Sequence, residues 1–209
     1  MKHIRATLLA SLALVAGVAQ ATPTFLPVGA QANVSLATVT GGGWTQCYAG
    51  TMNQFIGNNA ENVLSACAGD YLMMAGRQTG SNTFLALAAA LRSDTIVDTG
   101  NNSSTHTANG AEWWYSNDWS WGFTALGDTV QNNECDVGNS PLSMCLHTVN
   151  GAGGYRINNI TGLNSSTAYE KVFFVADSGP VNPIPEPGSL ALLGLGLVGL
   201  VAARKRAAK

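Results

Sequence analysis

Asp70-Tyr-Leu-Met-Met-Ala-Gly-Arg-Gln78 is a short stretch with an apolar centre, and the turn signal Thr79-Gly80-Ser81-Asn82 follows it. An apolar run of this length, bounded by turn residues, is typical of a buried β-strand. From Trp44 to Asp177, similar short runs alternate with turn signals at a spacing of about 8–15 residues. We therefore expect residues 44–177 to form one mainly β domain, an antiparallel sandwich-like or barrel-like fold, with an α+β arrangement as the alternative.

The segments around this strand predict the other elements of the domain. Residues 22–43 are expected to form an N-terminal strand, over residues 34–39, and a linker that ends in three glycines. The Ala- and Leu-rich residues 84–92 fit a helix by propensity and a strand by position, and both remain open. We expect further strands at residues 95–97, 155–157 and 169–175.

Charge is distributed unevenly along the chain. Six of the ten basic residues lie near its two ends, at positions 2, 5, 204, 205, 206 and 209. Residues 22–180 keep four basic side chains against eleven carboxylates, a net charge of −7, whereas the whole chain has −2. Nucleic acids and anionic lipids are bound by clustered cations, so this composition argues against both as partners.

Residues 1–21 have the parts of a secretory signal peptide. A positively charged start precedes an apolar run over residues 6–18, and Ala19-Gln20-Ala21 is an A-x-A cleavage site. The mature chain is then expected to begin at Thr22. A retained signal-anchor helix is the alternative.

The four cysteines, Cys47, Cys67, Cys135 and Cys145, all follow the predicted signal peptide. In an exported chain an even number indicates disulfides, and four cysteines allow three connectivities. We favour the local pairs Cys47–Cys67 and Cys135–Cys145, each stabilising the fold by about 3 kcal/mol. A zinc site formed by Cys135, Cys145 and His147 is the alternative. Because the chain has no C-x2-C pair, we expect no metal and no cofactor.

The C-terminal end contains three segments in a fixed order. Pro185-Glu186-Pro187 closes a proline-rich linker over residues 178–187, the run over residues 190–203 is uncharged and apolar, and Arg204-Lys205-Arg206 is basic. As a helix the apolar run would extend about 21 Å, against a hydrocarbon core of about 30 Å. Residues 188–209 are therefore expected to form a marginal transmembrane helix whose basic end stays cytoplasmic.

This order of segments resembles the PEP-CTERM sorting signal of Gram-negative bacteria that make exopolysaccharide. The resemblance implies processing near Pro185, Glu186 and Pro187 by an exosortase, a membrane-embedded cysteine transpeptidase. It also implies transient anchoring in the inner membrane and then a place at the cell surface or in the extracellular space, with the cleaved product either released or lipid-linked. The alternative is an ordinary, permanent C-terminal membrane anchor.

An aromatic cluster is the most suggestive feature of the exported region. Trp113, Trp114, Tyr115, Trp119 and Trp121 fall within nine residues and are interleaved with amide and carboxylate side chains. Strand periodicity would place Trp119 and Trp121 on one face. Ligand sites combine apolar faces with a few placed polar groups, so Trp114, Trp119 and Trp121 are candidates for glycan binding. Core packing of the same tryptophans is the alternative.

Catalytic signatures are weak. Ile96-Val97-Asp98-Thr99-Gly100 resembles an aspartic-protease signature, but that chemistry needs two such carboxylates and the motif occurs once. His106 and His147 have no accompanying nucleophile elbow. Glu134 and Asp136 are the nearest pair for glycoside cleavage, although their spacing is that of a solvated turn.

These observations predict an exported cell-surface or extracellular-matrix protein without catalytic activity. Its expected partners are an exosortase-type sorting enzyme, the inner membrane during processing, and exopolysaccharide; the matrix and biofilm role comes from the sorting-signal resemblance. The alternative is a secreted, glycoside hydrolase-like enzyme that acts on surface glycans.

Overall fold

The strand expected at residues 70–78 is present as β3 (Tyr71–Gln78), inside a four-stranded antiparallel sheet. The structure is a computed structural model that describes residues 22–131, 135–137 and 141–179. The sheet has the order β2-β13-β3-β5, with β2 (Thr45–Thr51), β13 (Tyr169–Ala176) and β5 (Ala86–Leu91) as its other strands. β3 therefore occupies an inner position, where its neighbours cover both of its edges.

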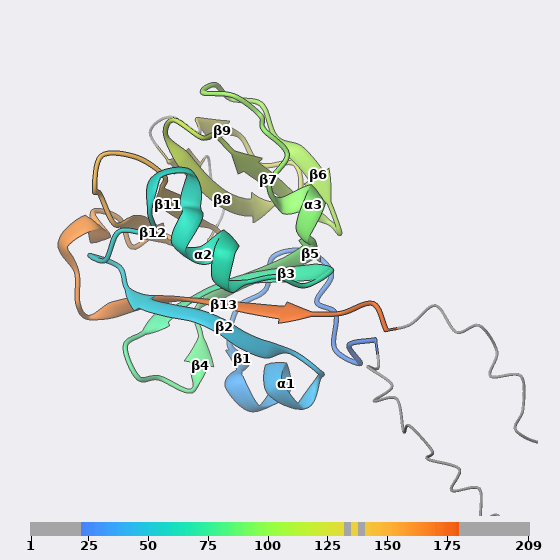
Figure 1. Cartoon of the computed structure of the whole chain (residues 1–209). Coiled ribbons are helices and arrows are strands. Elements are labelled where there is room, and N and C mark those ends of the chain that lie inside the picture. Colours follow the sequence, from blue (N-terminus) through green and yellow to red (C-terminus); the bar gives the residue numbers. More distant parts are fainter. Residues whose placement is uncertain (1–21, 132–134, 138–140, 180–209) are drawn as a thin grey trace, which may run out of the picture.

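A second, five-stranded antiparallel sheet packs against the first, and neither closes into a barrel (Figure 1). Its order is β12-β11-β8-β7-β6, where the strands are β12 (Gly154–Ile157), β11 (Met144–His147), β8 (Ser120–Ala125), β7 (Ala111–Tyr115) and β6 (His106–Ala108). Two short pairs complete the strands: β1 (Val34–Ser35) with β4 (Thr83–Phe84), and β9 (Val130–Gln131) with β10 (Asp136–Val137). The expected mainly β, antiparallel fold is confirmed as an open sandwich.

The helices are short and lie at the margins of the sheets. They are α1 (Leu36–Gly41), α2 (Glu61–Ala66) and α3 (Arg92–Thr95), with 3-10 turns η1 (Asn58–Ala60) and η2 (Leu163–Ser165). α1 lies on the outer side of the four-stranded sheet, below β13 in Figure 1.

The uninterrupted apolar character of β3 follows from burial on both faces. Leu72 and Met74 face the core between the two sheets, whereas Met73 and Ala75 face a second core on the other side of the four-stranded sheet. In the core between the sheets, Trp121 stacks on Phe173 with ring centroids 5.2 Å apart and an interplanar angle of 29°. Aromatic contacts of this kind stabilise the sandwich beyond the area that they bury.

The N-terminal segment differs from its prediction as a strand and linker. The strand expected over residues 34–39 ends at Ser35, because the Ser35 side chain accepts a 3.0 Å hydrogen bond from the Thr38 amide and caps α1. Phe25, Val34 and Leu36 pack against the second core. Residues 22–43 are thus part of the sandwich and cover one face of the four-stranded sheet.

The structure resolves one open alternative of the sequence analysis and contradicts one of its predictions. The Ala- and Leu-rich run is β5, since it pairs with β3 from Tyr71↔Leu91 to Gly76↔Ala86, and tertiary pairing overrides helix propensity. The strand predicted at residues 95–97 is wrong: α3 ends at Thr95, whose side chain donates a hydrogen bond to the Arg92 carbonyl.

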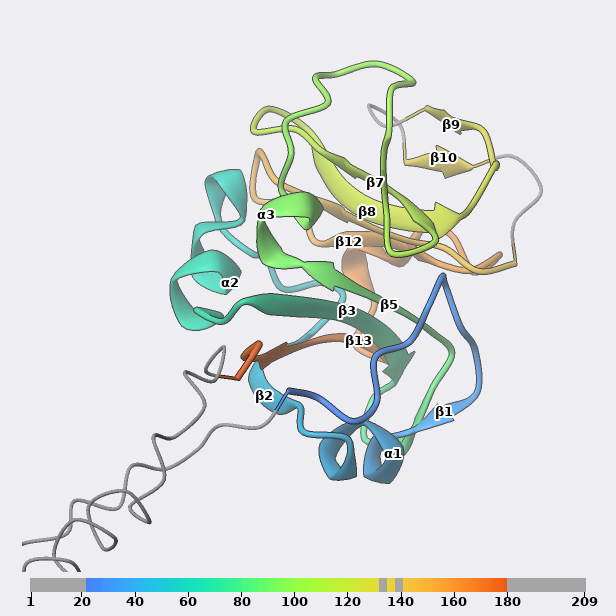
Figure 2. The ribbon, with the colours of Figure 1, turned by 90° about the vertical axis from the view of Figure 1, so that its right-hand side faces the viewer.

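Both ends of the described chain leave the domain at the same end of the sandwich, as Figures 1 and 2 show together. Within the described residues, no helix is long and apolar enough to cross a membrane. The predicted signal peptide at residues 1–21 and the predicted transmembrane helix at residues 188–209 lie outside the part of the chain that the structure describes.

Candidate functional site

The five tryptophans fall into two groups by burial. Trp44, Trp113, Trp114 and Trp121 are buried in the three apolar clusters of the domain, whereas Trp119 keeps 37% of its surface exposed. The prediction that Trp119 and Trp121 share one strand face is wrong, because β8 begins at Ser120 and Trp119 lies in the preceding turn. Of the three candidates for glycan contact, Trp119 alone presents its ring to solvent.

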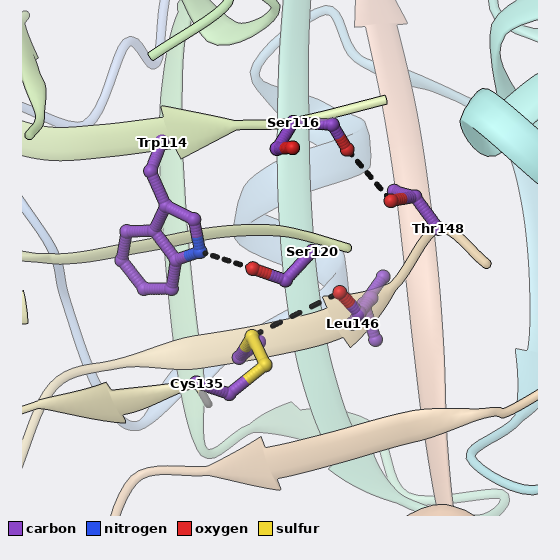
Figure 3. The surroundings of a disulfide bond; sticks show 7 residues. Trp114, Ser116, Ser120, Cys135, Leu146 and Thr148 are labelled. Atoms are coloured by element: carbon purple, nitrogen blue, oxygen red, sulfur yellow. Dashed lines mark hydrogen bonds between the residues drawn. A yellow bond between two sulfur atoms is a disulfide. The ribbon is translucent and has the colours of Figure 1, made fainter. Parts of the chain in front are cut away.

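Trp114 lies on the outer face of the five-stranded sheet, where the Cys135–Cys145 disulfide packs over it. Its cross-strand neighbour is Gly122, and its indole N–H donates a 3.2 Å hydrogen bond to the Ser120 hydroxyl (Figure 3). Val130, Cys135 and Cys145 pack around it. Because Trp114 and Trp121 are fully buried, their predicted role as glycan-stacking platforms is corrected to core packing.

The turn that carries Trp119 is fixed by hydrogen bonds from two sides. The Ser116 amide donates a 2.9 Å bond to the Ser120 carbonyl, which closes the turn between β7 and β8. Thr148, on the chain that follows β11, donates from its hydroxyl to the Ser116 carbonyl at 2.7 Å and from its amide to the Trp119 carbonyl at 3.0 Å. The Ser116–Thr148 bond is drawn in Figure 3. These buried contacts hold the turn in one conformation.

His147 lies beside this turn, and side chains from two further elements lie beside His147. The His147 ring, at the end of β11, lies close enough to the backbone of Trp119 and to the side chain of Asn164 in η2 for both groups to act on its pKa. It also meets the Tyr155 ring of β12 edge-on, with centroids 6.0 Å apart. We call Trp119, His147, Tyr155 and Asn164 the aromatic corner. Burial lowers the pKa of His147, and the Trp119 backbone and the Asn164 side chain act in the opposite direction.

The sequence predicted one member of the aromatic corner, Trp119. His147 was considered as a zinc ligand or catalytic base, and Tyr155 as part of a strand. Asn164 carried no signal, because its approach to His147 depends on how β11, β12 and η2 pack. Since β11 pairs with both β8 and β12, it brings His147 next to the Trp119 turn on one side and to Tyr155 on the other.

The cysteines pair as expected from their local spacing. Cys47 pairs with Cys67, at the end of α2, with a Cα–Cα distance of 5.2 Å, and Cys135 pairs with Cys145 at 5.6 Å. The second pair attaches the segment after β9 to the central part of the five-stranded sheet. Among the described residues, no three His, Cys, Asp or Glu side chains come together in a group able to hold a metal ion.

The carboxylates and histidines considered for catalysis have structural partners. Asp98 accepts a 2.9 Å bond from the Gly100 amide, which is a turn within the loop, and His106 lies 3.6 Å from Asp94. Glu112 accepts bonds from the hydroxyls of Thr105 and Thr107 at 2.8 Å and 3.0 Å. Glu134 lies outside the described residues. The side chain of Asp136, its partner in the pair considered for glycoside cleavage, is not described either; the backbone of Asp136 lies in β10.

A fully buried lysine stands among backbone oxygens. Lys171 is on β13, between Gly50 and Gly76 of the neighbouring strands, and it faces the core between the sheets. Its ammonium donates to the carbonyls of Thr51 at 2.8 Å and Met52 at 3.3 Å, and also to that of Gln54. Burial lowers its pKa to about 7.

The C-terminal boundary of the domain is set just after β13. The amide and the hydroxyl of Ser178 both donate to Oδ2 of Asp70, the residue before β3. These bonds lower the pKa of Asp70. They fix the point from which the proline-rich linker continues. The residues predicted for sorting (Pro185, Glu186, Pro187, Arg204, Lys205 and Arg206) and for signal cleavage (Ala19 and Ala21) lie outside the described residues.

Comparison with known families places one segment of the chain. Residues 183–206 match the family model of the PEP-CTERM protein-sorting motif. The chain carries a PEP-CTERM sorting motif. This motif directs export through the membrane to the cell surface or the outside, with processing by an exosortase. No curated protein and no solved structure matches the chain.

The PEP-CTERM motif covers a minor part of the chain and begins shortly after the last described strand. Its first residue, Pro183, lies five positions beyond Ser178, the residue that Asp70 holds. The motif and the β sandwich are thus consecutive along the chain, and the motif match carries no information on what the sandwich binds.

Proposed function

We propose that the β sandwich is a non-catalytic component of the cell surface or extracellular matrix, delivered there as an exosortase substrate. The single observation that carries this proposal is the PEP-CTERM motif at residues 183–206. In this proposal residues 1–21 are removed on export, and residues 188–209 anchor the chain briefly in the inner membrane. Cleavage near Pro185-Glu186-Pro187 then frees the domain.

The architecture of the domain is consistent with this route. Two disulfides suit an oxidising compartment outside the cytoplasm. Asp70 holds Ser178 against the domain, so the sandwich is complete before the proline-rich linker starts. Prolines at positions 180, 183, 185 and 187 lack a backbone N–H donor, and a segment of this composition suits recognition by a processing enzyme.

The test is the intact mass of the protein recovered from a host with an exosortase and from the same host without it. We expect a chain beginning at Thr22, carrying two disulfides and shortened near Pro185-Glu186-Pro187 when the enzyme is present. Replacement of residues 185–187 by Ala-Gln-Ala should leave export intact and block the C-terminal shortening. A full-length C-terminus in the inner membrane of the exosortase-containing host would overturn the proposal and leave a permanently tethered domain.

The enzymatic alternative, hydrolysis of surface glycans, has its own measurement. Purified mature protein is incubated with polysaccharide, and new reducing ends are counted. If the domain is non-catalytic, as proposed, we expect none. Release of reducing ends that is abolished by replacing one carboxylate would overturn the non-catalytic assignment.

A further inference from the structure

The geometry points to the aromatic corner as a binding site for a neutral polysaccharide, with the Trp119 indole as the stacking platform. This inference rests on the proposed function, since it names what the exported domain binds. Four observations carry it: the exposed tryptophan, its rigid support, the polar groups around it, and the sign of the charge.

Trp119 is exposed where packing does not require a tryptophan. The other four tryptophans are buried at 2% exposure or less, so the domain places its indoles inside wherever the core needs them. Trp119 stands in a turn between Asn117 and Asp118 on one side and Ser120 on the other, and turns favour small polar residues. A large apolar side chain that keeps 37% of its surface exposed at such a position suits contact with a partner surface.

The turn is rigid before any ligand arrives. Thr148 bonds to the carbonyls of both Ser116 and Trp119, and the Ser116 amide bonds to the Ser120 carbonyl. A platform that is already ordered loses little conformational entropy on binding, and this preorganisation raises affinity. An indole on a mobile loop would lack that advantage, because binding would first have to order the loop.

The surrounding groups match the hydroxyls of a sugar chain. Asn117, Asp118 and Asn164 are exposed, and the half-buried His147 and Tyr155 add ring edges with polar atoms. A pyranose ring offers an apolar face of C–H groups for the indole and equatorial hydroxyls that need both donors and acceptors. Amide, carboxylate, imidazole and phenol groups supply both.

The negative charge of the domain favours a neutral polysaccharide over an acidic one. Asp118 is adjacent to Trp119, and residues 22–180 carry four basic side chains against eleven carboxylates. An anionic chain would therefore meet repulsion over the whole domain, whereas a neutral hexose polymer would not. The proposal is accordingly limited to neutral polysaccharide.

The experiment is affinity electrophoresis of the mature, exported protein in gels containing dextran, a soluble β-glucan, or alginate as the carboxylated probe. We expect retardation by at least one neutral probe and none by alginate. Trp119→Ala should weaken the retardation about tenfold, as alanine replacement of an aromatic hot spot does, and Trp119→Phe should retain part of it. Leu126→Ala is the matched control, because Leu126 is 60% exposed at the opposite end of β8 and should not change the mobility.

Three outcomes would overturn the inference: no retardation by either neutral probe, equal retardation of wild type and Trp119→Ala, or retardation by alginate of similar strength. Thermal unfolding of each variant confirms that it is folded. Intact mass separates this inference from the proposed function. A correctly shortened chain that no neutral probe retards refutes the polysaccharide site alone, whereas an unshortened chain refutes the sorting proposal whatever the gels show.

Discussion

The ammonium group of Lys171 donates a 2.8 Å hydrogen bond to the carbonyl oxygen of Thr51, across the edge of the four-stranded sheet. The lysine side chain is fully buried, and its recorded partners are backbone oxygens of the chain that leaves β2. Carbonyl dipoles compensate a buried ammonium less completely than a carboxylate would, so burial lowers the pKa of Lys171 to about 7.

This pKa predicts how stability changes with pH. The unfolded lysine has a pKa of 10.5, whereas the folded one is near 7, so between these values the unfolded chain binds a proton that the folded chain has released. The free energy of unfolding contributed by Lys171 should therefore rise with pH from about 7 to about 10. Lys171 is the only lysine in residues 22–180, so urea unfolding at a series of pH values reports on this group with little interference from other lysines.

Lys171→Met isolates the effect. Loss of the donor leaves the carbonyls of Thr51 and Gln54 short of a partner, and we expect the variant to be about 2 kcal/mol less stable near neutral pH. The stability difference between wild type and variant should grow from pH 7 to pH 10. Parallel curves for the two proteins would show that Lys171 does not titrate in this window.

Trp119 and Trp121 should respond to truncation to different extents. Trp121 is fully buried and stacks on Phe173, so Trp121→Ala should lower the free energy of unfolding by about 3–5 kcal/mol. Trp119→Ala, at a site that is 37% exposed, should cost less, about 1–2 kcal/mol. Chemical denaturation of both variants checks this, and an equal loss would place Trp119 in the core as well.

Gly122 is required where β8 passes beneath Trp114. A Cβ atom at this position would lie 2.2 Å from the Met144 carbonyl oxygen and 2.3 Å from Cζ2 of Trp114. Gly122→Ala should therefore cost about 3 kcal/mol, from overpacking against backbone. Gly41→Ala is the control: nothing lies within 4 Å of its Cβ position, and a helical site should tolerate or favour alanine.

The two disulfides should contribute comparable stability, with the longer loop contributing slightly more. Cys47–Cys67 spans 20 residues and Cys135–Cys145 spans 10. In the chain-entropy account each removal costs about 3 kcal/mol. The paired serine variants, Cys47→Ser with Cys67→Ser and Cys135→Ser with Cys145→Ser, are compared by thermal unfolding. Unchanged stability after loss of either bond would contradict the account for that loop.

Asp70 should control the order of the chain as it leaves the domain. Asp70→Ala removes the acceptor for both the amide and the hydroxyl of Ser178, so hydrogen exchange at the Ser178 amide should accelerate while the core amides are unaffected. Because these bonds lower the pKa of Asp70, acid should weaken them only below the ordinary aspartate pKa of 3.8. Asp177→Ala serves as the control, because it removes the carboxylate next to Ser178 and leaves Asp70 in place. Unchanged exchange at Ser178 would mean that the contact is not maintained in solution.

Much of the fold could be predicted from short patterns. The apolar run of β3, the turn after it, and the closing strand β13 were predicted because period and turn chemistry are local properties. The helix α1 and the strand character of β5 could not be decided in this way. The first depends on a single capping hydrogen bond from Ser35, and the second on pairing with β3, which outweighs the helix propensity of alanine and leucine.

The candidate site was less predictable than the fold. Five aromatic residues close together in the sequence suggested a sugar-binding face, but alternation along β7 and β8 sends Trp113 and Trp121 inward and Trp114 under the disulfide cover. His147 lies beside the Trp119 backbone, and Tyr155 and Asn164 lie beside His147; because these residues come from separate elements, they leave no local signature in the sequence.

By itself the sequence determined where this protein goes: a PEP-CTERM motif is read as a linear string, so no folding is needed to present it. It also indicated the mainly β class and the local cysteine pairs. Only the tertiary structure decided which tryptophan meets solvent and where the chain leaves the domain. Burial is a property of two packed sheets, and no single strand carries the information about what covers it.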